Sequence, residues 1–178
     1  MKRDPTQHTE LERCALCASP LGVLHDHFYD PRAREVYRAC EGCAVIHPTA
    51  HPARYRRIPR RLATVDLDAK RCLAVLGVPV SIVVVRLRDD GRAIAEYPGP
   101  AGLVSSEITP NVWSALRAAV PAVGRLEPEV EALLVCSTLR GGMLCGIDVV
   151  LEVLGELRAR PEAPAVVARM LAELREAR

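Results

Sequence analysis

Two CxxC pairs near the amino terminus constrain the fold of this chain more than any other feature of its sequence. The first pair is Cys14 and Cys17, the second is Cys40 and Cys43, and 22 residues separate them. A CxxC turn directs two thiolates at one point, so two such turns supply a tetrahedral set of four sulfur ligands. Soft thiolates in this geometry select zinc, with iron as the natural competitor. The spacing therefore predicts a four-sulfur metal site, which is structural by default because it leaves no open coordination position.

The residues beside the two pairs favour zinc over iron. Iron held by four thiolates would make the chain a rubredoxin-like electron carrier, and such proteins usually have glycine just after each CxxC turn. Ala18 and Ala44 stand at those positions here, and aromatic residues make up only 3% of the chain. We therefore expect zinc, with a rubredoxin-like iron centre as the alternative.

The segment between the two pairs has the pattern of a β-hairpin. GVLHDHFYD and REVYRAC are strand-like, with a turn near residues 30–32, and AVIH after the second pair can start a short helix. This order predicts a small zinc-ribbon or treble-clef module. His25 and His27 are two residues apart, so on a strand they share one face. There they hydrogen-bond across the sheet, contact a partner or hold a second metal ion.

The pattern of a CxxC pair, a strand with His-Asp-His and a second CxxC pair resembles the zinc-stapled HNH nucleases of the endonuclease VII type. The resemblance implies that His27 is a general base beside a catalytic divalent ion. The ligands that it implies for this ion are Asp26 or Asp30 together with His47 or His51. The chain has Ala44 where these nucleases usually have asparagine, and Pro48 and Pro52 interrupt the helix expected to carry the last ligand. A nuclease is therefore less favoured than structural or interaction histidines.

Length and composition limit the class of protein. The 178 residues suffice for one ordinary domain with a small metal-stapled appendage. The formal net charge of +2 argues against a dedicated nucleic-acid-binding protein. The start of the chain has no signal-peptide pattern, and the longest apolar run, residues 72–85, is too short to span a membrane. We therefore expect a cytoplasmic protein whose seven cysteines are metal ligands or buried thiols.

The chain has three zones. Residues 1–46 form the predicted zinc-binding module, residues 47–61 a linker rich in proline and arginine, and residues 62–178 an α+β domain. In the last zone we expect the order ββαββαα, an antiparallel sheet and helices on one face. The expected elements are a helix over 65–76, a strand over 80–87, a hairpin turn at 89–91 into a second strand, a rigid loop at 98–102, a helix from 109 to about 119, a second hairpin across 141–142, and helices at about 148–160 and 164–177.

An arginine-rich strip in the linker is a candidate surface for binding a partner. It consists of Arg54, Arg56, Arg57, Arg60 and Arg61, with Tyr55 among them. Such a strip can bind phosphates or an acidic protein surface. The alternative is a solvated linker in a chain whose basic residues are nearly all arginine. The loop at 98–102 is a second candidate contact.

Two further features carry weaker expectations. The segment LEPEVEALL has three carboxylates two residues apart, and we expect it to cover a strand edge. Cys72 lies on an apolar helix face, whereas Cys136 and Cys145 lie on opposite arms of one hairpin and are neighbours in some registers. We expect each of the three to be a small buried side chain, with a redox pair as the alternative.

Short motifs follow one another in a specific order along most of the chain. They are the CxLC…HxH…CxxC module from Cys14 to Cys43, then Arg54–Pro59, Val78–Val80, Tyr97–Gly102, Val130–Val135 and Ile147–Gly155. This order resembles a bacterial family encoded near the genes of uptake nickel–iron hydrogenases. The resemblance implies a role in hydrogenase assembly, maturation or electron delivery. Together with the four-sulfur site, it predicts a non-enzymatic zinc-binding accessory protein whose partner is a hydrogenase subunit or maturation factor.

Overall fold

The structure is a computed structural model that describes residues 12–47, 54–138, 141–159 and 169. It divides into two units, residues 1–57 and residues 58–178. We call them the amino-terminal unit and the carboxy-terminal unit, and each is described by itself. The division falls within residues 47–61, the segment that the sequence predicts to be a linker.

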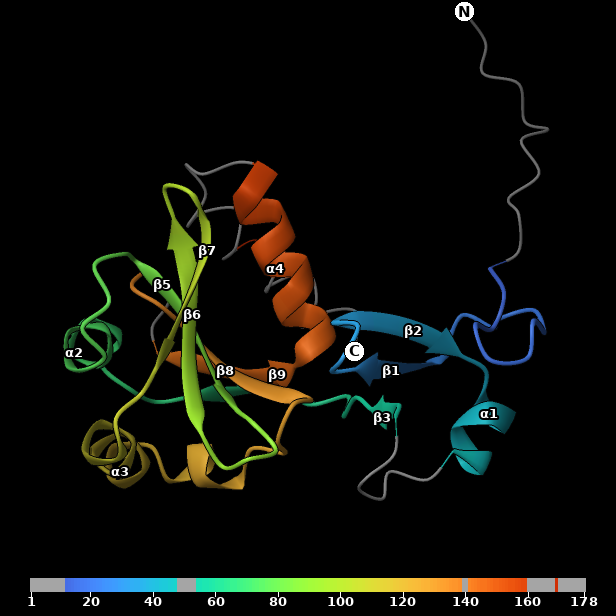
Figure 1. Cartoon of the computed structure of the whole chain (residues 1–178), viewed down its shortest axis with the longest axis horizontal. Helices are drawn as coiled ribbons and strands as arrows, with labels where there is room; N and C mark the ends of the chain where they lie inside the picture. Colours follow the sequence, from blue (N-terminus) through green and yellow to red (C-terminus); the bar gives the residue numbers. More distant parts are fainter. Residues whose placement is uncertain (1–11, 48–53, 139–140, 160–168, 170–178) are drawn as a thin grey trace, which may run out of the picture. The chain divides into compact units, whose positions relative to one another are not determined.

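The amino-terminal unit contains a small antiparallel sheet and one short helix (Figure 1). The strands are β1 (Asp26–Asp30), β2 (Glu35–Ala39) and β3 (Arg56–Arg57), in the order β2-β1-β3, and the helix is α1 (Glu41–Ile46). The turn between β1 and β2 forms because the Asp30 carboxylate accepts hydrogen bonds from the backbone N–H groups of Arg32 and Ala33. Arg34 completes the turn with a left-handed φ of 58°. The hairpin is where the sequence predicts it, whereas β3 lies in the expected linker.

The hydrophobic core of the amino-terminal unit is small and contains two of the cysteines. Phe28 and Ala39 are fully buried, and Cys14, Cys43 and Ala44 pack with them. A cluster of this size cannot by itself offset the conformational entropy that a unit of about 50 residues loses on folding. The amino-terminal unit therefore needs a further source of stability.

The carboxy-terminal unit is built on a six-stranded sheet in which every strand pair is antiparallel. In sheet order the strands are β4 (Leu62–Val65), β9 (Gly142–Gly146), β8 (Glu131–Cys136), β5 (Ile82–Leu87), β6 (Ala93–Gly99) and β7 (Gly102–Glu107). The antiparallel sheet with helices confirms the α+β class predicted from the sequence.

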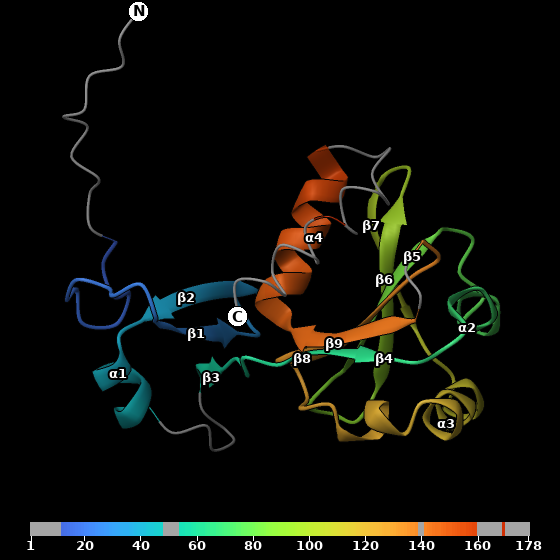
Figure 2. The same ribbon diagram turned by 180° about the vertical axis from the view of Figure 1, so that it is seen from behind.

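Helices cover both faces of this sheet, whereas the sequence pattern predicts helices on one face only. On one side lie α2 (Ala69–Val75), α3 (Pro110–Ala119) and the 3-10 helix η1 (Pro121–Arg125), and on the other lies α4 (Ile147–Ala159) (Figures 1 and 2). The central strands explain the difference. All six residues of β8 are buried, and so are the first five of β5, so both faces of these strands need a covering layer.

Individual elements differ from their predicted bounds where pairing with a strand distant in the sequence determines the local structure. The predicted helix over 65–76 begins only at Ala69, because residues 62–65 pair with β9 instead. Asp68 caps this helix by accepting from the Arg71 N–H. The expected loop at 98–102 is the tight turn of a hairpin between β6 and β7. The helix predicted over 164–177 lies outside the described residues.

The described helices are also too short or too polar to cross a membrane.

Candidate metal centre

The two CxxC pairs bring their four sulfur atoms together. All four lie within 4.8 Å of one another, and the Sγ atoms of Cys17 and Cys40 are 3.6 Å apart. Four sulfurs placed about 2.3 Å from a central zinc ion are separated by about 3.8 Å. The arrangement therefore fits one tetrahedral ion with Cys14, Cys17, Cys40 and Cys43 as its ligands.

Backbone hydrogen bonds shape the first CxxC turn. The Ala18 N–H donates to the Cys14 carbonyl at 2.8 Å, and Ala18 takes a left-handed φ of 61°. Alanine thus adopts the conformation that glycine adopts more readily. The Ala15 N–H donates to the carbonyl of Arg38 at 2.9 Å, which fastens the turn to β2. The thiol of Cys17 contacts the Ser19 hydroxyl at 3.3 Å, and this hydrogen bond lowers the pKa of Cys17.

The second CxxC turn joins a strand to a helix. Cys40 follows β2 directly and is the N-cap residue of α1, and Cys43 lies in the first turn of that helix. The Ala44 N–H donates to the Cys40 carbonyl at 3.0 Å and fixes the spacing of the two thiols. The order of turn, hairpin, turn and helix agrees with the module expected from the sequence.

As free thiols, the four cysteines hold their protons unequally. Burial raises the pKa of Cys14, but hydrogen bonds from backbone N–H groups, first that of Cys40, outweigh it and lower this pKa to about 6. A hydrogen bond with Cys17 raises the pKa of Cys43 to about 12. Cys14 therefore loses its proton more readily than Cys43, and Cys43 has to release its proton when an ion binds.

The cysteine site suits a structural ion better than a catalytic one. Cys14 and Cys43 are buried, Cys40 is half-buried and Cys17 is exposed. Four protein sulfurs complete a tetrahedral shell, so no position is left for a substrate or an activated water. An ion here would link the loop at residues 14–17 to α1 and tie both to the core around Phe28.

The residues that the nuclease resemblance selects do not gather around a second ion in the described part of the chain. The Asp26 carboxylate accepts hydrogen bonds from the guanidinium of Arg57 at 2.7 and 3.0 Å. The Asp30 carboxylate accepts from Arg54 at 3.0 Å, and this contact lowers the pKa of Asp30. In residues 12–47, 54–138, 141–159 and 169, only the cysteine group brings three or more potential ligands together.

The described histidines do not share one set of neighbours. His25 and His27 lie close to each other, with 5.1 Å between their ring centroids. The ring of His47 packs edge-on against Phe28 at 6.4 Å. His51 lies outside the described residues.

Several members of the arginine strip form ion pairs within their own unit. Arg54 and Arg57 bind the two carboxylates of β1 and stay 67% and 45% exposed at their side chains. Arg61 lies 3.4 Å from Glu131 in the carboxy-terminal unit. Arg56 is buried in β3. That the strip binds a partner stays a prediction for Arg54, Arg56, Arg57, Arg60 and Arg61. A partner would have to compete with these internal ion pairs.

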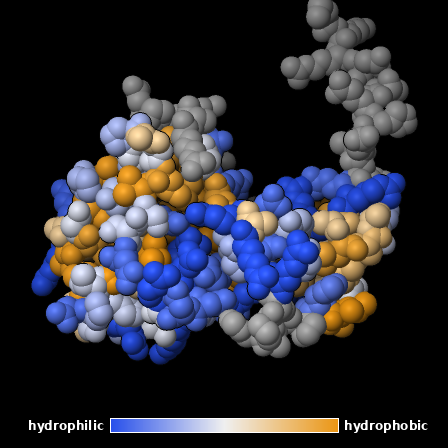
Figure 3. Space-filling model, viewed as in Figure 1, coloured by the Kyte–Doolittle hydropathy of each residue, from blue (hydrophilic) through white to orange (hydrophobic). Residues whose placement is uncertain are grey.

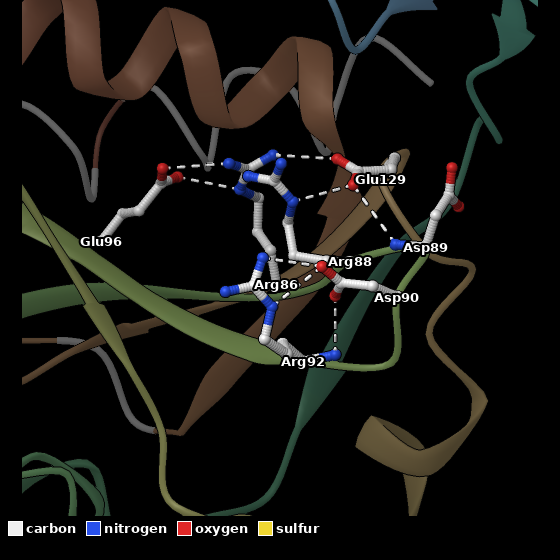
Figure 4. A network of polar contacts seen from close by, with 7 residues as sticks. All are labelled: Arg86, Arg88, Asp89, Asp90, Arg92, Glu96 and Glu129. Atoms are coloured by element: carbon white, nitrogen blue, oxygen red, sulfur yellow. Dashed lines mark hydrogen bonds and ion pairs between the residues drawn. The ribbon is translucent and has the colours of Figure 1, made fainter.

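A network of charged residues with a buried centre, which no local sequence pattern predicts, lies on the sheet of the carboxy-terminal unit (Figure 4). Arg86 in β5 donates two hydrogen bonds to Glu96 in β6, at 2.8 and 2.9 Å, and both side chains are buried. Glu129 lies 2.9 Å from Arg88 and 3.9 Å from Arg86. The strand alternation turns Arg86 and Glu96 away from the α2 and α3 side, toward the face covered by α4.

This network corrects the expectation for LEPEVEALL. Its carboxylates do not cover a strand edge, because β8 is an interior strand between β9 and β5. Glu129 and Glu131 are buried and each lies near an arginine. The signal in the sequence was a single charged residue within each of two apolar strands, Arg86 in VSIVVVRL and Glu96 in AIAEY.

The three remaining cysteines are buried, as expected. Burial raises the pKa of Cys72 on α2. The register pairs Cys145 with Ala132, four residues away from Cys136, so the hairpin does not make Cys136 and Cys145 neighbours. Adjacent residues in a strand are about 3.4 Å apart, which places the two thiols well beyond disulfide distance.

Comparison with known proteins gives a family but no function. The model of a family of unknown function, DUF5947, matches residues 13–163. Neither the curated proteins nor the solved structures contain a match. The matched range includes all four cysteines of the candidate metal centre and the strands and helices from β1 to α4.

Proposed function

The chain belongs to the DUF5947 family, whose function is unknown, and from this premise we propose that it is a non-enzymatic zinc-binding accessory protein. The observation that carries the proposal is the convergence of four cysteine sulfurs within 4.8 Å. An ion in this position contributes its binding free energy to folding of the amino-terminal unit. The role of the metal in this proposal is to hold a contact surface in shape.

Zinc is the proposed ion, and the cytoplasm the proposed location. Alanine after each CxxC turn and the low aromatic content support zinc over a rubredoxin-like iron centre. Four of the seven cysteines are placed as metal ligands and the other three are buried, and this use of cysteine supports a reducing compartment. A red protein with thiolate-to-iron absorption after anaerobic purification would favour iron instead.

Exposed apolar side chains on the amino-terminal unit support an interaction role. Val23 and Leu24 precede β1 and are 98% and 82% exposed, and Val45 and Ile46 at the end of α1 are 79% and 74% exposed. Figure 3 shows hydrophobic side chains gathered at the surface over α1. Exposed apolar patches of this kind are typical of protein contacts. The arginine strip and the turn at 98–102 are further proposed contacts.

The kind of partner comes from the motif order. Because that order resembles a family encoded near uptake nickel–iron hydrogenases, we propose a hydrogenase subunit or a maturation factor as the partner. The role would be in assembly, maturation or interaction, and the protein would carry out no chemical step itself.

Co-purification tests this function. The tagged full chain, expressed in a bacterium that makes a nickel–iron hydrogenase, should retain a hydrogenase subunit or maturation factor. The double variant Val45→Ser, Ile46→Ser should keep its metal and lose the partner, since the removed apolar surface is exposed. Val104→Ser, which changes an exposed apolar residue in β7, is the matched control and should retain the partner. Wild-type protein that retains no component of the hydrogenase system would contradict the proposed partner.

The nuclease alternative has its own test. Plasmid nicking that requires added Mg²⁺ and disappears in His27→Ala would replace the accessory role by an enzymatic one. Absence of such nicking in metal-loaded protein is the expected result.

A further inference from the structure

His25 and His27 form a pair on the amino-terminal unit that the four-sulfur site does not use. His27 lies in β1, and His25 directly precedes this strand. Because side chains alternate along a strand, both imidazoles lie on one face of β1 and Phe28, in the cysteine-containing core, lies on the other. The two Nε2 atoms are 3.2 Å apart, and both residues are only half-buried.

A backbone contact determines which nitrogen of His25 carries its proton. Nδ1 of His25 lies 3.2 Å from the carbonyl oxygen of Gly22, and a carbonyl can only accept. In the neutral ring Nδ1 is therefore protonated, so Nε2 of His25 accepts the hydrogen bond that joins it to Nε2 of His27, and an ion bound between the two nitrogens would replace this hydrogen bond. Imidazoles that bind metals also donate one ring N–H to a carbonyl or carboxylate, while the other nitrogen ligates the ion.

The separation of the two Nε2 atoms also suits a shared ion. Two nitrogens at about 2.05 Å from one ion lie about 2.9 Å apart in an octahedral shell and about 3.35 Å apart in a tetrahedral one. The observed 3.2 Å falls between these two values. We propose that His25 and His27 form a second metal site, which takes a divalent transition ion of the class that imidazole prefers, such as Zn²⁺ or Ni²⁺.

This second site differs from the cysteine site in the number and type of its ligands. The two imidazoles supply two of the four or more positions that such an ion needs, so further donors have to complete the shell. Arg38 lies opposite His27 in the sheet and brings a positive charge. Its guanidinium forms an ion pair with the carboxylate of Glu12, which offsets that charge. An ion here binds weakly compared with one held by four thiolates, and it exchanges ligands readily.

The test uses the full chain with one equivalent of zinc already bound, titrated with Ni²⁺ by calorimetry. Absorption spectra report whether nickel reaches the thiolates. We expect wild-type protein to bind one Ni²⁺ with no thiolate-to-nickel bands and with its zinc retained. His25→Gln and His27→Gln should each weaken Ni²⁺ binding by roughly tenfold or more, since each removes one of two ligands. His47→Gln, in the same unit but packed on Phe28, is the matched control and should bind as wild type does.

The outcomes separate this site from the cysteine site. Wild-type protein that holds one zinc and binds no nickel would overturn the histidine site while leaving the four-sulfur site intact. Equal nickel affinity in wild type, His25→Gln and His27→Gln would overturn it as well. If His27→Gln loses its zinc, the nickel affinity of His25→Gln decides whether the histidine site exists. His25 lies outside β1, so its substitution leaves this strand unchanged.

Discussion

Single residues of one type take different roles according to their surroundings, and the cysteines are the clearest case. Four of them converge on one point, whereas Cys72, Cys136 and Cys145 are buried apart in the carboxy-terminal unit. Their spacing in the sequence anticipates this difference, because only the four form CxxC pairs. The roles of the charged residues are harder to predict from the sequence, because their partners come from distant parts of the chain.

The pair Asp90 and Arg92 gives a prediction at this scale. The guanidinium of Arg92 donates to the Asp90 carboxylate at 2.8 Å and holds the pKa of Asp90 below its ordinary value. A lowered pKa in the folded state means that the pair stabilises the fold above the ordinary pKa of about 3.9 and loses this effect as the pH falls through the folded value. Arg92→Gln should return the pKa of Asp90 toward the ordinary value, measured by carboxyl-carbon NMR.

Arg88→Gln is the control for this titration. Arg88 affects the pKa of Asp90 only as a minor charge, so the shift should be smaller than in Arg92→Gln. An Asp90 that titrates identically in wild type and Arg92→Gln would show that the ion pair does not form in solution.

At the scale of elements, the sheet of the carboxy-terminal unit depends on a few contacts between strands. Arg86 and Glu96 lie on neighbouring strands, β5 and β6, and are 1% and 3% exposed. On the other face of these strands, Val83, Val85, Ala93 and Ala95 belong to the apolar core. The network in Figure 4 therefore places buried charges on the face of these strands that α4 covers, and removing the Glu96 carboxylate deprives the buried Arg86 guanidinium of its nearest counter-charge.

Glu96→Gln should lower the free energy of unfolding of the carboxy-terminal unit by about 3–5 kcal/mol, because the Arg86 charge stays buried. Trp113 is the only tryptophan and lies in α3, so its fluorescence in a urea titration reports on this unit. Glu107→Gln removes half of the exposed ion pair with Arg92 and should change little. If the two substitutions had equal effects, the buried pair would have no special role in stability.

The hairpin between β8 and β9 depends on Gly141. Its φ of 102° is outside the range of most side chains, and a Cβ atom there would lie 2.3 Å from the carbonyl oxygen of Val65. Gly77 also has a positive φ, of 65°, but a Cβ there meets no described atom within 4 Å. Gly77→Ala should therefore cost only about 1–2 kcal/mol.

Gly141→Ala should cost more than Gly77→Ala, because the clash with the Val65 backbone adds to the conformational penalty. The urea midpoint followed by Trp113 fluorescence measures both variants. A smaller loss in Gly141→Ala than in Gly77→Ala would show that the chain around Gly141 takes another conformation.

The same contacts explain what the sequence could and could not predict. Local patterns located β1, β2, β5, α3 and α4, because turn residues, caps and apolar periodicity lie within each segment. Strands β3, β4 and β7 were missed because each is defined by its partner, β1, β9 and β6 respectively. The four-sulfur site followed from CxxC spacing, whereas the ion pairs of the arginine strip depend on contacts that no local pattern encodes.

At the scale of the whole molecule, the two units should differ in what holds them together. The carboxy-terminal unit has a large apolar core on a six-stranded sheet. The amino-terminal unit has only a few buried apolar residues, two of which are cysteines of the candidate metal centre. Metal removal should therefore act on one unit only.

Cys40→Ser should unfold the amino-terminal unit and leave the carboxy-terminal unit folded. Limited proteolysis should then cleave the variant before about residue 57 and release a resistant carboxy-terminal fragment. Cys72→Ser is the matched control, because this thiol lies on α2 and takes no part in the metal centre. Equal resistance of Cys40→Ser and wild type would mean that the amino-terminal unit folds without its metal.

X-ray absorption at the zinc edge, combined with elemental analysis of the purified chain, examines the four-sulfur site itself. We expect one zinc per chain, with four sulfur neighbours at about 2.3 Å and no nitrogen or oxygen in its first coordination shell. A chain that carries no stoichiometric metal, or an ion surrounded by imidazole and carboxylate, would contradict the structural role assigned to Cys14, Cys17, Cys40 and Cys43.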